Sequence, residues 1–169
     1  VNGPGGIAPD QRSWSEVEKE YAFVDELAAL RPKVTDAGNL ERFDYWLNTM
    51  RYLKAMGQVN CTWARFNAAM EELKTQENAE NRRQLARDKA LPIRRELVEQ
   101  TGQVHRLLLE TITTTGGMGT VANWQQHLLP SLLTQPGKEL AAILGESLPA
   151  DAQPSNSYEG PPRLIVPTV

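Results

Sequence analysis

The sequence has few of the residues that disulfides, metal sites and nucleic-acid surfaces require. It contains one cysteine and two histidines among 169 residues. Cys61 cannot form an internal disulfide, and its neighbours lack the Cys and His spacing of a metal site, so we expect a buried structural thiol rather than a reactive one. The net charge of −3 gives no basic surface, and no apolar run approaches the roughly 20 residues that span a bilayer. We therefore expect neither a nucleic-acid partner nor a membrane partner.

The short motifs of common reaction centres are also absent. The sequence has no G-x-S-x-G elbow, no Walker A loop, no Rossmann fingerprint and no H-E-x-x-H pair. Glu41 and Asp44 lie on one predicted helix and cannot flank a glycosidic bond by themselves. We expect no catalytic residue, no metal and no cofactor in this chain; an acid and a base would come from elsewhere.

What the sequence does contain is a helical pattern over residues 13–148. Ser13 and Glu16 form a capping box that starts the first helix, and Pro32 should stop it. Apolar periodicity then predicts helices over the ranges 39 to about 57 or 58, about 60 into the charged stretch 71–89, 92 to 112, 120–133 and 136–148. Pro130 should kink or end the helix that contains it. The predicted fold class is all-α, with five or six helices in an orthogonal or bundle-like array.

The two ends have a different composition. Residues 1–12 are rich in Gly and Pro and predict a linker. Residues 149–169 combine turn residues with a short strand-like run that ends at Pro167. We expect this segment to be a linker followed by an edge strand, or by the first strand of a β domain that the chain lacks. Both ends are expected to continue into a longer polypeptide.

Three glycines in four residues interrupt the helical pattern between 116 and 119. A glycine loop that opens a helix lets another molecule approach the backbone closely. Amide, indole and imidazole side chains follow it, a mixture that suits a sugar ring. The candidate substrate-binding residues are Gly117, Gly119, Asn123, Trp124 and His127. For Trp124 a packing role, and for His127 a structural role, remain the alternatives.

A second polar group lies on the predicted helix that begins at residue 39. Asp44, Asn48 and Arg51 share one face at i, i+4 and i+7. Either they form an intrahelical network that braces Trp46 in the core, or they form a polar rim that faces a cleft. We predict that Trp46 is buried and that these three side chains are held in polar contacts.

Four strings of the sequence resemble the helical region that follows the barrel in large bacterial polysaccharide-degrading glycoside hydrolases, of the agarase-like kind. They are residues 21–27, 38–52, 116–127 and 160–168. The resemblance implies a preceding catalytic (β/α)8 barrel and a following β-sandwich in the same polypeptide, and a secreted or periplasmic location. It names no catalytic residue in this chain.

Two functions are therefore expected to compete. In the first, the chain is the helical segment of a multidomain glycoside hydrolase, packs on the barrel and borders the cleft for a marine-type polysaccharide. The lack of an Arg or Lys cluster near the glycines favours an uncharged or weakly charged polysaccharide. In the second, it is a non-catalytic helical interaction or scaffolding module.

Overall fold

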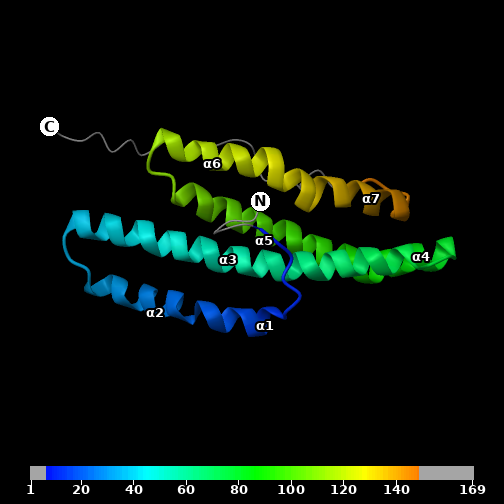
Figure 1. Cartoon of the computed structure of the whole chain (residues 1–169), viewed down its shortest axis with the longest axis horizontal. Coiled ribbons are helices and arrows are strands. Elements are labelled where there is room, and N and C mark those ends of the chain that lie inside the picture. The colour runs from blue at the N-terminus through cyan, green and yellow to red at the C-terminus, as the bar shows by residue number, and fades with distance from the viewer. Residues whose placement is uncertain (1–6, 149–169) are drawn as a thin grey trace.

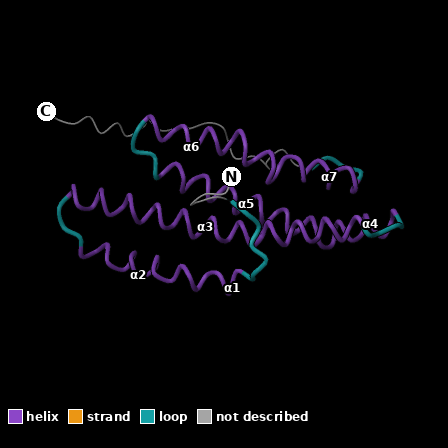
Figure 2. The backbone as a smooth tube through the Cα atoms, viewed as in Figure 1, coloured by secondary structure: helices purple, strands orange, loops and turns teal. Residues whose placement is uncertain are grey.

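The computed structural model describes residues 7–148, and these residues form four long helical rods (Figure 1). In chain order the rods are α1 (Trp14–Val17) with α2 (Ala22–Leu30), α3 (Ala37–Lys74), α4 (Ala79–Leu85) with α5 (Leu91–Glu110), and α6 (Met118–Asn123) with α7 (Gln135–Leu144). Short loops join the rods, so consecutive rods run antiparallel (Figure 2). Residues 7–148 contain no strand, and none of their helices is both long and apolar enough to span a bilayer.

In three of the rods, 3-10 turns, which are tighter than α-helix, and π-helical turns, which are wider, link or extend the α-helices. The segments Glu18–Tyr21 and Arg31–Lys33 are 3-10 turns that continue α1 and α2, and Thr115–Gly117 is a 3-10 turn that leads into α6. The segments Ala86–Ala90, Trp124–Leu128 and Pro130–Thr134 are π-helical turns. These turns let each rod continue without a break in the chain direction.

The all-α prediction is confirmed, but the expected five or six helices are four. The predicted end at Gly57 or Gln58 is wrong, because α3 continues through both residues for 38 residues in total. A Cβ on Gly57 would lie 2.8 Å from Cε2 of Tyr21. Gly57 therefore allows the first rod to approach α3 closely and does not terminate the helix.

The predicted helix from residue 60 into 71–89 is also wrong, because the chain reverses between Lys74 and Ala79. Asn78 starts α4 by accepting hydrogen bonds from the backbone N–H groups of Glu80 (2.9 Å) and Asn81 (3.0 Å). The side-chain cap satisfies helix N–H groups that have no partner within the helix, so a new helix can begin here.

Pro130 does not end the helix that contains it, and the last two predicted helices are not separate. The backbone N–H of Leu129 bonds to the carbonyl of Trp124, five residues earlier, and the N–H of Gln135 bonds to the carbonyl of Pro130. These wide turns accommodate a residue that has no N–H to donate. The ranges 120–133 and 136–148, expected as two helices, thus lie in one rod.

The main core lies between α3, the α4–α5 rod and the α6–α7 rod. Its fully buried side chains include Phe66, Leu73, Leu97, Leu132 and Leu140. Burial of this apolar surface is the dominant stabilising contribution.

The α1–α2 rod packs against α3 with a smaller buried surface, to which Val17 and Val24 contribute, and the contact extends past the middle of α3 to Gly57. Three ion pairs add to this contact: Lys54 pairs with Asp25 and with Glu18, and Arg31 pairs with Asp44. Glu16 supports the start of the rod by accepting a hydrogen bond from the backbone N–H of Ser13 (2.9 Å), as the predicted capping box requires, and a further one from the Ser13 hydroxyl (2.6 Å).

Part of the predicted linker 1–12 is described and contacts the bundle. The backbone N–H of Asp10 donates to the carbonyl of Asn60 (3.1 Å), and Ile7 packs against the core. The predicted strand and the rest of the segment 149–169 lie outside the described residues.

Candidate functional site

The glycine loop lies where the chain passes from α5 to α6. Gly117 ends the 3-10 turn Thr115–Gly117, and a Cβ placed on it would lie 3.1 Å from Cδ1 of Ile112. Gly119 is exposed, with open space around its Cα. Gly117 therefore serves close packing within the chain, whereas Gly119 borders solvent. Asn123 and His127 are also exposed and lie on the following helical turns.

Trp124 faces inward and is 5% exposed. Its ring lies 5.6 Å from that of His105 on α5, with the planes tilted by 31°. Burial raises the pKa of the nearby Tyr52. The Trp124 indole N–H is itself buried and has no hydrogen-bond partner among the described residues. The Trp124 ring is thus covered by protein, in accord with the packing alternative, and it offers no open face to a sugar.

Trp46 has the opposite environment, and the prediction that it is buried is wrong. It is 56% exposed, while the adjacent Leu47 is 1% exposed and occupies the inward position. Neighbouring helical residues point about 100° apart, so an inward Leu47 places the indole on the outer surface. The helix is apolar on several sides, and its sequence did not show which side faces the protein.

The polar residues near Trp46 are partly engaged, as predicted. The Asp44 carboxylate accepts two hydrogen bonds from the Arg31 guanidinium, at 2.6 and 2.8 Å, and this interaction lowers the pKa of Asp44. Asn48 accepts a longer hydrogen bond from Arg51, at 3.4 Å. The strong contact is therefore between two rods, and the predicted intrahelical network is reduced to one weak bond.

A groove of about 350 Å³ lies beside Trp46. We call it the end groove; its lining residues are Gly38, Glu41, Arg42, Tyr45, Trp46 and Thr113. The first five belong to the start of α3, and Thr113 belongs to the loop that leads to the glycines. The fold thus places the start of α3 beside Thr113. The predicted residues Gly117, Gly119, Asn123, Trp124 and His127 do not line the end groove.

The end groove combines aromatic and polar groups. The rings of Tyr45 and Trp46 meet edge to face, with centroids 5.3 Å apart and planes at 75°. Arg42 donates from Nε to the carbonyl of Gly38 (3.2 Å), and the Glu41 carboxylate has no partner among residues 7–148. An exposed indole beside a carboxylate, a guanidinium and a hydroxyl can stack on a sugar ring and bond its hydroxyls.

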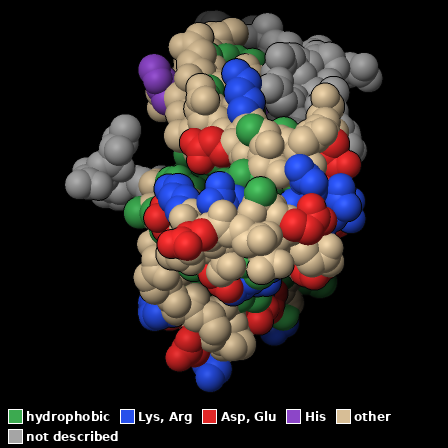
Figure 3. Space-filling view, turned by 90° about the vertical axis from the view of Figure 1, so that its right-hand side faces the viewer, with side chains coloured by type: hydrophobic (Ala, Val, Ile, Leu, Met, Phe, Trp, Pro, Cys, Tyr) green, Lys and Arg blue, Asp and Glu red, His purple; other side chains and the backbone are tan. Residues whose placement is uncertain are grey.

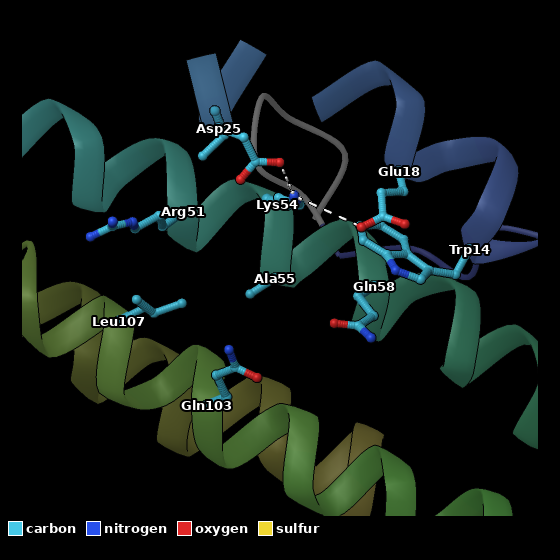
Figure 4. A pocket seen from close by; sticks show the side chains of 10 residues that line it. Trp14, Glu18, Asp25, Arg51, Lys54, Ala55, Gln58, Gln103 and Leu107 are labelled. Carbon is cyan, nitrogen blue, oxygen red and sulfur yellow. Dashed lines mark hydrogen bonds and ion pairs between the residues drawn. The ribbon is translucent and has the colours of Figure 1, made fainter. Parts of the chain in front are cut away.

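A second groove, of about 360 Å³, runs between the α1–α2 rod and α5, with α3 as its floor (Figure 4). We call it the lateral groove. Its lining residues are Trp14, Glu18, Val24, Asp25, Arg51, Lys54, Ala55, Gln58, Gln103 and Leu107. The sequence did not indicate this groove. The stripe of residues 51, 54, 55 and 58 on one face of α3 was visible, but the residues that face it come from two other rods.

The described residues contain no arrangement that holds a metal. No group of three or more His, Cys, Asp or Glu side chains lies close enough together within 7–148 to bind one. Cys61 is buried, as predicted, and burial raises the pKa of its thiol, which keeps the sulfur protonated. Charged side chains of both signs are interspersed on the face at the α4 and α7 end of the molecule (Figure 3). On that face no surface of a single charge forms.

Comparisons of this chain with protein-family models, with curated proteins and with solved structures find no match. The two grooves and their side chains are therefore the basis on which a function can be argued.

Proposed function

We propose that this chain is the helical, non-catalytic segment of a multidomain polysaccharide-degrading glycoside hydrolase and that its end groove contacts the carbohydrate. The observation that carries the proposal is the exposed Tyr45–Trp46 pair beside Glu41, Arg42 and Thr113. The proposal moves the aromatic platform from Trp124, whose ring is covered, to Trp46. Gly119, Asn123 and His127 are exposed but do not line the end groove, and they remain candidate contacts for the carbohydrate.

The side chains of the end groove suit a sugar for physical reasons. An indole presents an apolar face to the C–H groups of a pyranose, and covering roughly 40 Å² of apolar surface in this way contributes about 1 kcal/mol. Glu41 accepts hydrogen bonds, Arg42 donates them, and Thr113 does both. The carboxylate and the guanidinium together carry no net charge, which favours an uncharged or weakly charged polysaccharide.

The resemblance to post-barrel regions supplies the wider setting of this proposal. The partners would be a catalytic barrel before the chain and a β-sandwich after it, in a secreted or periplasmic enzyme. The catalytic acid and base would belong to the barrel, at the ends of its strands. The helical segment would extend the substrate cleft without taking part in bond cleavage.

Affinity electrophoresis tests this proposal. The chain is run in native gels that contain a neutral galactan or a sulfated galactan, and its mobility is compared with a gel without polysaccharide. We expect retardation by the neutral polymer and a clear reduction of that retardation in Trp46→Ala. Phe23→Ala is the matched control, because Phe23 is 45% exposed and does not line the end groove. Unchanged retardation of Trp46→Ala would refute a role for the indole.

A helical interaction module is the second candidate, and one observation favours it. The large apolar side chains that are exposed within 7–148, Phe23, Leu30, Tyr45 and Trp46, all lie on α2 or the first half of α3. Exposed apolar residues gathered on neighbouring elements are typical of surfaces that dock another folded domain. This function predicts no retardation by any polysaccharide, so the same gels distinguish the two candidates.

A further inference from the structure

The lateral groove has the properties of a small binding site. Its volume of about 360 Å³ lies within the range of roughly 300–1,000 Å³ that is typical of ligand pockets. Three rods form it, so its shape depends on the tertiary fold and not on one helix face. Trp14 and Gln58 lie at one end, and Gln103 and Leu107 reach it from α5 (Figure 4).

The charged groups of the lateral groove largely neutralise one another. The Lys54 ammonium contacts the Asp25 carboxylate at 2.9 Å and the Glu18 carboxylate at 3.8 Å. The Arg51 guanidinium points away from these groups at the far end of the groove (Figure 4). With two carboxylates and two cations, the groove carries no net charge that would attract a strongly charged ligand.

Two amides supply the hydrogen-bonding capacity that remains. The Gln58 and Gln103 side chains project into the same space from α3 and α5 (Figure 4). Neither has a hydrogen-bond partner among the described residues. Each amide offers two donors and one acceptor, and so matches hydroxyl groups, which both donate and accept.

Trp14 adds an apolar surface next to these amides. Its ring is tilted by 33° against that of Tyr21, with centroids 6.3 Å apart, and it is partly exposed. Val24, Ala55 and Leu107 complete the apolar part of the lining. An indole, two unpaired amides and balanced charges form the combination that recognises a neutral, hydroxyl-rich ring.

We propose that the lateral groove is a second carbohydrate-binding site, which takes one unit of a neutral oligosaccharide. The inference rests on the proposed function for its ligand class, but its residues are distinct from those of the end groove. Gln58 and Gln103 bond the sugar hydroxyls, and Trp14 packs against the ring. The two sites would allow one polysaccharide chain, or two, to be held along the helical segment.

Nuclear magnetic resonance on the 169-residue chain tests the proposal. Neutral galactan oligosaccharides and oligogalacturonate are titrated separately, and the side-chain amide signals of Gln58 and Gln103 and the indole N–H signal of Trp14 are followed. We expect all three to shift with the neutral ligand only. The amide signal of Gln84, which donates to Asp88 on the α4 rod, should stay in place.

Variants separate this proposal from the proposed function. Gln58→Ala combined with Gln103→Ala should weaken the binding seen at Trp14 roughly tenfold, since each lost hydrogen bond contributes modestly. Trp46→Ala should leave the Trp14 shift unchanged. If the neutral ligand shifts Trp46 but none of the lateral signals, the lateral site is refuted while the proposed function stands. A shift with oligogalacturonate alone would refute the assignment to a neutral sugar.

Discussion

Replacing Trp124 should destabilise the protein strongly, whereas replacing Trp46 should not. Trp124 is 5% exposed and packs beside His105 and Tyr52, so Trp124→Ala leaves a cavity in the core. Large buried aromatics that are truncated to alanine cost about 3–5 kcal/mol. Trp46 is 56% exposed, and its removal should cost less than about 1 kcal/mol.

Thermal and urea unfolding, followed by circular dichroism at 222 nm, measure both changes. For a chain of 169 residues, each kcal/mol corresponds to roughly 2–4 °C in Tm. We expect Tm to fall by about 6–20 °C for Trp124→Ala and by less than about 4 °C for Trp46→Ala. Equal losses in the two variants, or a larger loss for Trp46→Ala, would refute the assignment of these residues to core and surface.

Three further predictions concern stability and reactivity. Gly57→Ala should lower the free energy of unfolding by about 1–3 kcal/mol, because the new methyl group meets the Tyr21 ring. In a Tyr21→Ala background the same change should be neutral or stabilising through helix propensity, and equal losses in both backgrounds would contradict the contact. Burial lowers the pKa of His105 below its ordinary value near 6.5, so folding disfavours its protonation. The stability that the neutral His105 ring contributes is present above pH 6.5 and is lost as the pH falls below this value. The free energy of unfolding, measured by urea titration at several pH values, should therefore depend less on pH in His105→Gln. An unchanged pH dependence would contradict this. The buried Cys61 thiol, whose pKa is raised by burial, should react with a thiol reagent only as fast as the protein unfolds, and rapid reaction in the native state would show that it is accessible.

The helical class could be predicted because its signals are local. The Ser13–Glu16 capping box and the apolar periodicity act within a few residues, and the structure shows both. The number of helices could not be predicted in the same way. Gly57 and Pro130 locally favour the end of a helix, but the tertiary structure overrides this preference. The Tyr21 ring fills the space where a side chain at position 57 would lie, and the helix continues through Gly57. At Pro130, π-helical turns allow the helical rod to continue.

The candidate site was only partly predictable for a related reason. The sequence marked both the start of α3 and the glycine loop as unusual. The end groove contains Tyr45 and Trp46 of the first stretch, but only Thr113, which precedes the glycines, from the neighbourhood of the second. Which tryptophan faces outward depends on which residue of the helix packs inward, and Leu47 takes that place. The lateral groove involves three rods, so no single stretch of sequence could indicate it.

Isothermal titration calorimetry of the native chain and of Trp46→Ala with a neutral galactan oligosaccharide measures whether the end groove binds carbohydrate. Apolar surface covered on the exposed indole contributes about 1 kcal/mol, so Trp46→Ala should raise the Kd of the end groove about fivefold. Phe23→Ala should leave Kd unchanged. Equal Kd values for the native chain and Trp46→Ala, or no binding by the native chain, would contradict the claim that the end groove contacts carbohydrate.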